Sequence, residues 1–236
     1  TGATKGIAAT QSGSGALSIT ATGDVTGSAD NGIDATTVGT QLTIDAVNVT
    51  SYEVGISADN NGTGDLSITS TGAVSGSDMG VYGKNSLSAN DLSIMAADVS
   101  GGFGGIVAFN DGSGALSIAS TGDVTGASAH GIDAATVGTE LTIDAVNVTG
   151  ELNGIFANNN GTGDLSITST GAVTGETGIG INATNAGTDL TINAAVVSGY
   201  DWGIYAKNNG TGDLSITSVD TVTGTSANGI DAINGG

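Results

Sequence analysis

Leu42-Thr-Ile-Asp-Ala-Val-Asn-Val-Thr50 is the stretch that decides the fold, and it returns unchanged at residues 141–149. Its first part, Leu-(Ser/Thr)-Ile, recurs along the whole chain of 236 residues. The two apolar residues of this string are spaced by two, which is the period of a β-strand with one buried face. The recurring leucines follow one another at intervals of 24 to 26 residues: Leu17, Leu42, Leu66, Leu92, Leu116, Leu141, Leu165, Leu190 and Leu214.

Two further landmarks accompany each Leu-x-Ile string. A valine follows alternately six and five residues after the isoleucine, so that two repeats make a unit of about 49 residues. The valines are Val25, Val49, Val74, Val99, Val124, Val148, Val173, Val197 and Val222. A Gly-Ile-x-Ala string comes next, with its apolar residue at Ile7, Ile33, Ile56, Val81, Ile106, Ile132, Ile155, Ile181, Ile204 and Ile230. Gly, Asn, Thr, Ser and Asp separate the three landmarks, and these are turn residues.

Three strands and three turns in one repeat describe one coil of a parallel β-helix. Helical repeats are excluded because no segment shows a period of 3.6 residues, and the leucine-rich-repeat motif is missing. We therefore predict an all-β fold, a parallel β-helix (β-solenoid) of about nine coils of 23–26 residues. Composition does not change along the chain, so residues 1–236 are predicted to be a single solenoid. Coils stacked at about 4.8 Å give a rod on the order of 45 Å long.

The pattern also predicts what each recurring residue does. Landmark leucines and isoleucines point inward, and the alanine of Gly-Ile-x-Ala is small because the interior narrows at a corner. The glycine before each isoleucine is expected to adopt dihedral angles that other residues avoid. A recurring asparagine after the alanine is expected to form a hydrogen-bonded ladder along the rod. Its members are Asn60, Asn85, Asn110, Asn159, Asn185 and Asn208. The absence of proline fits strands that pair on both sides.

Neither end of the sequence carries a polar or amphipathic capping segment, which free solenoids normally require. The pattern is already under way at Gly6-Ile7 and ends in a loop at Asn234-Gly235-Gly236. We therefore expect that the sequence is an excerpt of a longer rod, or a protomer that stacks on copies of itself.

Charge and composition exclude several classes of function. The chain has 23 acidic residues, three lysines and no arginine, for a formal net charge of -20. Nucleic-acid binding rests on basic residues that neutralise phosphates, so nucleic acid is not an expected partner. No apolar run approaches the ~20 residues of a membrane helix, so this segment is not expected to insert into a membrane. Without cysteine, a disulfide framework and a thiolate zinc site are also excluded.

Units such as Gly163-Asp-Leu-Ser-Ile-Thr-Ser-Thr-Gly-Ala-Val-Thr-Gly175 and Gly203-Ile-Tyr-Ala-Lys-Asn-Asn-Gly-Thr-Gly212 point to a family. The whole chain resembles the passenger regions of bacterial autotransporters and related large surface adhesins. This resemblance implies a right-handed β-helix that is secreted and displayed on the bacterial cell surface. The translocator barrel and signal peptide of that family do not occur in these residues.

The first candidate site is a calcium site formed by acidic residues. The residue before each landmark leucine is expected on the surface, and it is acidic in four consecutive coils: Glu140, Asp164, Asp189 and Asp213. Like charges about 5 Å apart repel, so a bound cation would relieve them, and clustered carboxylates suit Ca²⁺. The alternative is an acidic face that is simply solvated. A second set that recurs on alternate coils has the same two interpretations: Asp34, Asp45, Asp133, Asp144 and Asp231. No cofactor is expected, apart from calcium at these acidic residues.

Aromatic residues are the second candidate site. Tyr200, Trp202, Tyr205 and Phe156 are expected to point outward and to share one exposed patch. Such a patch suits stacking on host or environmental glycans, or packing against a neighbouring copy of the rod. The alternative is that the loop aromatics fold over the rod and shield it.

Two other functions are weighed against a structural or adhesive rod. The middle residue of Leu-x-Ile is always Ser or Thr, and regular hydroxyl arrays on β-solenoids are typical of ice-binding proteins. Parallel β-helices also include polysaccharide-degrading enzymes, but lyases of that kind use an Arg or Lys base, and the three lysines are isolated: Lys5, Lys84 and Lys207. His130 lies before Gly131-Ile132 with no nucleophile nearby, and is expected to be a turn residue. The sequence therefore predicts a non-enzymatic extracellular rod with no catalytic residues.

Overall fold

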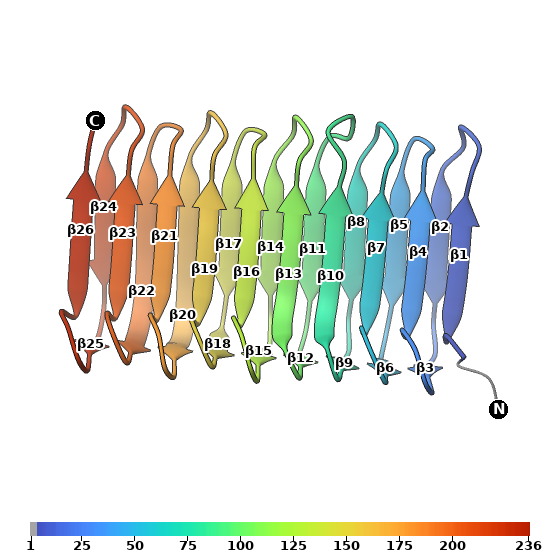
Figure 1. The fold of residues 1–236 in the computed structure, drawn as a ribbon, viewed down its shortest axis with the longest axis horizontal. Helices are drawn as coiled ribbons and strands as arrows, with labels where there is room; N and C mark the ends of the chain where they lie inside the picture. The colour runs from blue at the N-terminus through green and yellow to red at the C-terminus, as the bar shows by residue number, and fades with distance from the viewer. Residues whose placement is uncertain (1–3) are drawn as a thin grey trace.

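The computed structural model describes residues 4–236, and these residues form 26 β-strands and no helix. All strand pairs are parallel, and each strand pairs with its equivalents one coil earlier and one coil later. The strands form three ladders along one rod (Figure 1), which we name after their landmark residues. The predicted all-β solenoid is therefore confirmed, and each complete coil contributes to all three ladders.

The isoleucine ladder is a sheet of ten strands that carries the Gly-Ile-x-Ala strings. Its members are β1 (Ile7–Gln11), β4 (Ile33–Thr37), β7 (Ile56–Asn60), β10 (Met79–Asn85), β13 (Gly104–Asn110), β16 (Ile132–Thr136), β19 (Ile155–Asn159), β21 (Ile181–Asn185), β23 (Ile204–Asn208) and β26 (Ile230–Asn234). The ladder runs without interruption from β1 to β26.

The leucine and valine ladders belong to one continuous sheet. The leucine ladder contains β2 (Leu17–Ala21), β5 (Leu42–Ala46), β8 (Leu66–Ser70), β11 (Leu92–Ala96), β14 (Leu116–Ser120), β17 (Leu141–Ala145) and β24 (Leu214–Ser218). The valine ladder contains β3 (Val25–Gly27), β6 (Val49–Ser51), β9 (Val74–Gly76), β12 (Val99–Gly101), β15 (Asp123–Gly126), β18 (Asn147–Gly150) and β25 (Val222–Gly224). Two long strands belong to both ladders, β20 (Leu165–Gly175) and β22 (Leu190–Gly199).

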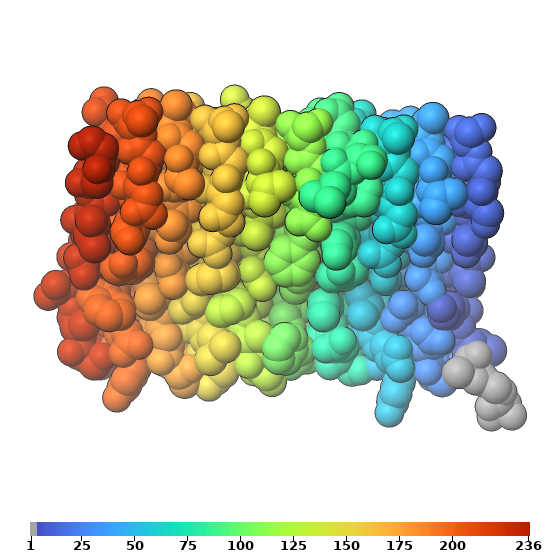
Figure 2. All heavy atoms as spheres, turned by 45° about the horizontal axis from the view of Figure 1, so that its top comes forward, coloured from blue at the N-terminus to red at the C-terminus, as the bar shows by residue number. Residues whose placement is uncertain are grey.

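The chain winds in a right-handed sense. In Figure 1 it rises along the isoleucine ladder in front, passes over the top, descends along the leucine ladder behind and returns to the front, one step closer to the C-terminus. The space-filling view shows the result, a rod whose colour bands succeed one another from one end to the other (Figure 2). The right-handed winding implied by the family resemblance agrees with the structure.

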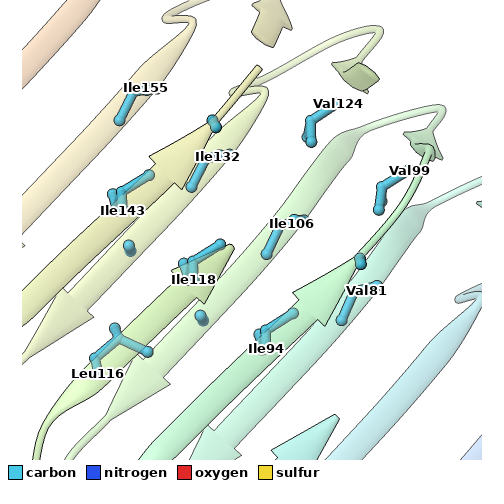
Figure 3. Packing of buried hydrophobic residues seen from close by; sticks show 14 of the residues in the cluster. Val81, Ile94, Val99, Ile106, Leu116, Ile118, Val124, Ile132, Ile143 and Ile155 are labelled. Atoms are coloured by element: carbon cyan, nitrogen blue, oxygen red, sulfur yellow. The ribbon is translucent and has the colours of Figure 1, made fainter. Parts of the chain in front are cut away.

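The core is one continuous apolar column along the rod axis. Landmark residues such as Leu42, Ile44, Val49 and Ile56 are fully buried. Figure 3 shows how equivalent residues succeed one another in the middle of the rod, with Ile94, Ile118 and Ile143 in one row. Burying one such side chain stabilises the fold by about 1.5–3 kcal/mol. Each interior coil adds a similar contribution, so stability accumulates along the rod.

The asparagine ladder is present inside the rod, and it is interrupted once. Asn60 donates its side-chain amide to Asn85 at 3.1 Å, and Asn85 donates to Asn110 at 3.1 Å. A second run joins Asn159 to Asn185 at 2.9 Å and Asn185 to Asn208 at 3.1 Å. In the coil between the two runs, Thr136 takes the place of asparagine and donates its hydroxyl to the backbone oxygen of residue 110. The ladder therefore consists of two three-residue runs.

The reason predicted for the recurring glycines is wrong. None of the glycines in the described residues has a positive φ. Glycine is instead required because neighbouring coils approach closely: a Cβ at Gly32 would lie 2.4 Å from Cγ1 of Val49 and 2.6 Å from the oxygen of Gly55. These contacts leave no room for any side chain.

The small alanine of Gly-Ile-x-Ala also has a different cause from the predicted one. Ala35 lies at the centre of β4, not at a corner, and it is fully buried. At Gly83, which replaces alanine in β10, a Cβ would already lie 3.3 Å from Cδ1 of both Ile68 and Ile94. The isoleucines of the opposite ladder fill the interior, so only a small residue fits here.

Candidate functional site

The predicted acidic column exists on the surface, and two of its carboxylates bond to the next coil. Asp164 accepts the backbone N–H of Asp189 at 2.9 Å and also the hydroxyl of Thr188. Asp189 in turn accepts the backbone N–H of Asp213 at 2.8 Å. The bonds from Thr188 and from the Asp189 backbone lower the pKa of Asp164 below its usual value. These carboxylates therefore close the corner of one coil onto the next.

The acidic residues do not converge on one point. Within residues 4–236, no three Asp, Glu or His side chains are arranged so that they could hold a metal ion together. Glu140, Asp164, Asp189 and Asp213 are spread over successive coils, since the leucines that follow them pair in register. Among the described residues, the structure gives Asp164 and Asp189 a structural role and does not bring the four carboxylates together around one point.

The second predicted acidic set is divided between two ladders. Asp34 and Asp133 lie on the isoleucine ladder, where Asp34 forms an ion pair with Lys5. Asp45 and Asp144 lie on the leucine ladder, at a different side of the coil. The set therefore does not form one acidic face.

Corner bonds of the same kind occur before the valine ladder. Asp98 accepts the backbone N–H of Asp123 at 2.9 Å, and Asn147 accepts that of Ala172 at 2.8 Å. In each pair the side chain of one coil bonds to the equivalent position of the next. At a corner these N–H groups need a partner, and an Asp or Asn oxygen supplies it.

His130 has the same structural role before the isoleucine ladder. Its Nδ1 accepts the backbone N–H of Asn153 at 3.3 Å, just as Asn153 accepts that of Ile179 at 2.9 Å. The imidazole stacks on Phe156 with ring centroids 5.1 Å apart and planes 15° apart. Burial lowers the pKa of His130, against the opposing charge of Asp133. The hydrogen bond that Nδ1 accepts and the lowered pKa both favour a neutral imidazole. This structural role fits the turn position that the sequence predicts for His130.

The structure brings together only part of the predicted aromatic patch. The rings of Trp202 and Tyr205 lie 5.8 Å apart, and Tyr200 is 52% exposed two residues before the tryptophan. Phe156 does not join them, because Asn182 stands between Phe156 and Tyr205 in the isoleucine ladder. The candidate aromatic surface is therefore Tyr200, Trp202 and Tyr205.

Two hydroxyl columns run along the outside of the rod. The predicted one is in register on the leucine ladder: Ser18, Thr43, Ser67, Ser93, Ser117, Thr142, Ser166, Thr191 and Ser215. The second was missed, although a Ser or Thr after every landmark valine signals it in the sequence. It lies on the valine ladder: Thr26, Thr50, Ser75, Ser100, Thr125, Thr149, Thr174, Ser198 and Thr223.

A row of three surface pockets, which we call the elbow groove, follows the end of the leucine ladder on the side of the valine ladder. One of its pockets, of about 250 Å³, is lined by Thr20, Ala21, Thr22, Asp45, Ala46, Val47, Thr69 and Thr71. A second, of about 410 Å³, is lined by Ala119, Ser120, Thr121, Asp144, Ala145, Val146, Thr168 and Thr170. A third, of about 370 Å³, is lined by Thr168, Ser169, Thr170, Asn193, Ala194, Ala195, Thr217 and Val219.

The second and third pockets share Thr168 and Thr170, so these two are continuous from the coil of Leu116 to that of Leu214. The first pocket is separate from them, because the coil of Leu92 lines neither it nor the second pocket. Sequence reasoning missed this groove. The sequence contains one signal for it: a polar residue recurs three residues after most of the landmark leucines. This recurrence does not show whether the neighbouring surface is hollow.

No helix of the described part is long and apolar enough to cross a membrane. No protein-family model, curated protein or solved structure matches the chain, so its function has to be inferred from its own residues.

Proposed function

We propose that the chain is a non-enzymatic, extracellular structural or adhesive rod on a bacterial cell surface. In this proposal it forms part of a longer surface adhesin of the autotransporter passenger kind, or a protomer of a filament. The observation that carries the proposal is the uninterrupted repetition of one coil from β1 to β26. A molecule built from one repeated coil is suited to act as a spacer, with its outward columns available to partners.

Stiffness would follow from the way that the coils are joined. Turn residues form backbone hydrogen bonds to the preceding coil, as strand residues do. For example, Thr63 N–H donates to the oxygen of Gly39 at 3.1 Å, and Asn209 N–H donates to that of Asn185 at 2.7 Å. The buried asparagine runs add side-chain bonds along the same axis. Bending such a rod would stretch bonds on every face, and short bonded turns would resist proteases.

The absence of catalysis is part of the proposal. Its support is the lack of arginine, the scarcity of lysine, and the engagement of His130 in a corner bond. Tyr200, Trp202 and Tyr205 are the surface that we propose for contacts with glycans or with neighbouring rods. Tyr200 is exposed and the other two are half-buried, and aromatic rings that reach the surface suit both kinds of contact.

Two observations on the protein test this proposal. Electron microscopy of the purified chain should show straight rods on the order of 45 Å long, or filaments of such rods joined end to end; irregular or branched particles would contradict it. Antibodies against the chain should label intact cells of the source organism. Labelling that requires cell lysis would contradict display on the surface.

A second candidate function, ice binding, is favoured by one observation. Two hydroxyl columns, not one, run in register along the same sheet. Regular hydroxyl spacing on a rigid face is what binding to an ice lattice needs. Measurable thermal hysteresis would support this function, and freezing at the same temperature as a control protein of equal concentration would remove it.

A further inference from the structure

We propose that the elbow groove binds partners through their lysine side chains, and that Asp45 and Asp144 are the two ammonium subsites. This adds a class of partner to the proposed adhesive function. It rests on that function in one respect, that the outside of the rod is a binding surface. It begins from two pockets with the same design, four coils apart on one ladder.

Each of the two pockets is lined by one exposed carboxylate, on a strand between two coils that both supply hydroxyls. Around Asp45 stand Thr20 and Thr22 of the preceding coil, and Thr69 and Thr71 of the following one. The pocket of Asp144 repeats the arrangement, with hydroxyls from Thr121, Thr168 and Thr170. Its apolar surface comes from Ala145 and Val146, as it does from Ala46 and Val47 in the first pocket.

These two carboxylates have no partner within the described part of the chain. The ion pairs among residues 4–236 join Lys5 to Asp34 and Lys84 to Asp111, and no side-chain hydrogen bond there involves Asp45 or Asp144. The net charge of -20 favours a cationic occupant and disfavours a second copy of the same acidic rod.

A primary alkylammonium fits the chemistry of each pocket. Its three N–H donors match one carboxylate and the neighbouring threonine oxygens, and its methylene stem can lie on alanine and valine. One carboxylate is too few for Ca²⁺, which takes six to eight oxygens. A lysine side chain satisfies both the polar and the apolar parts of the pocket.

The spacing of the subsites predicts the form of the partner. Asp45 and Asp144 lie in one column, and four coils at about 4.8 Å separate them by about 19 Å. An extended peptide advances about 3.3 Å per residue, so lysines six residues apart span nearly the same distance on one face. Between the two, Met95 occupies the same column. The third pocket has Asn193 at this position and lacks the charge.

The test is calorimetric titration of the whole chain with the blocked peptide Lys-Ser-Thr-Ser-Thr-Ser-Lys at low salt. Its binding should be at least roughly fivefold tighter than that of Lys-Ser-Thr-Lys-Ser-Thr-Ser, which has the same charge but cannot reach both subsites. Asp45→Asn and Asp144→Asn should each remove this advantage. Asn193→Asp should increase the affinity for both peptides, a gain that an unfolded variant cannot show.

Glu176→Gln is the matched control, because it removes one exposed charge outside the groove. It should change the affinity by less than about twofold. Equal binding of the two peptides, or an equal loss in Glu176→Gln, would reduce the effect to general attraction and overturn the proposal. Tighter binding of the corresponding arginine peptide would overturn the assignment to lysine. If lysine binding fails in either way, the proposed surface rod is not affected, because microscopy and cell labelling test it separately.

Discussion

The carboxylate of Asp164 accepts the backbone N–H of Asp189, its counterpart in the next coil, at 2.9 Å. The same relationship joins Asp98 to Asp123 before the valine ladder and Asn153 to Ile179 before the isoleucine ladder. Side chains thus continue the hydrogen bonding of the coils around the corners. Many Asp and Asn residues at the corners therefore serve to accept backbone N–H groups of the next coil. Only the acidic residues without such a bond remain available for partners.

Removing a corner acceptor should destabilise the rod modestly. Asp164→Ala leaves the N–H of Asp189 to water, and we expect a loss of about 0.5–1.5 kcal/mol in the free energy of unfolding by urea. Asp164→Asn keeps an oxygen at this position and should lose less. Equal losses in the two variants would show that charge, and not the corner bond, is what matters.

Acid should weaken the same corner. The pKa of Asp164 is lowered in the folded chain by the hydroxyl of Thr188 and the N–H of Asp189, relative to an ordinary value of about 3.9. The unfolded chain therefore binds the proton first, so the stabilisation is present above the unfolded pKa and is lost as pH falls through the folded pKa. Stability curves of wild type and Asp164→Asn should therefore converge as the pH falls below the ordinary aspartate pKa and through the lower pKa of the folded chain. A constant difference down to pH 2 would contradict this.

Calcium should not stabilise the chain. Glu140, Asp164, Asp189 and Asp213 do not converge, and two of them already bond to backbone N–H groups. Millimolar Ca²⁺ should leave the Tm unchanged, and EDTA should do the same. A rise of several degrees that is lost in Asp189→Asn would restore the calcium hypothesis from the sequence.

The gap in the asparagine ladder can be filled. Thr136 stands between Asn110 and Asn159, each at the end of a three-residue run. Thr136→Asn should join the runs and raise the free energy of unfolding by about 0.5–1.5 kcal/mol. Asn185→Ala, by contrast, removes fully buried bonds to Asn159 and Asn208 and should cost about 2–4 kcal/mol. Urea unfolding checks both, and a destabilised Thr136→Asn variant would contradict the ladder account.

A pair of glycine variants separates close packing from chain flexibility. Gly32→Ala places a Cβ against Val49 and Gly55 and should cost about 1–3 kcal/mol or more. At Gly23 a Cβ meets nothing within 4 Å, so Gly23→Ala should be neutral or stabilising by up to about 1 kcal/mol. Similar losses at both positions in thermal unfolding would point to backbone conformation as the cause.

The sequence was sufficient for the coil, the three ladders and the asparagine ladder, because spacing by two and a period near 25 residues directly encode stacked strands. The sequence was insufficient to predict which residues of neighbouring coils come into close contact and on which side of the coil each residue lies. Gly32 looked like a turn residue, but glycine is required there because Val49 of the next coil approaches its backbone closely. Asp45 and Asp34 looked like one acidic set, and only the fold places them on different ladders. Phe156 was grouped with Tyr205 because an outward position does not show which ring of another coil it meets.

The central claim, a stiff rod of stacked coils, is tested most directly by the distance between two spin labels. The chain has no cysteine, so Thr43→Cys and Ser215→Cys place labels on one hydroxyl column, seven coils apart. Pulsed electron spin resonance should give a narrow distribution centred near 34 Å, from seven steps of about 4.8 Å. A broad distribution, or a centre far from this value, would contradict the account.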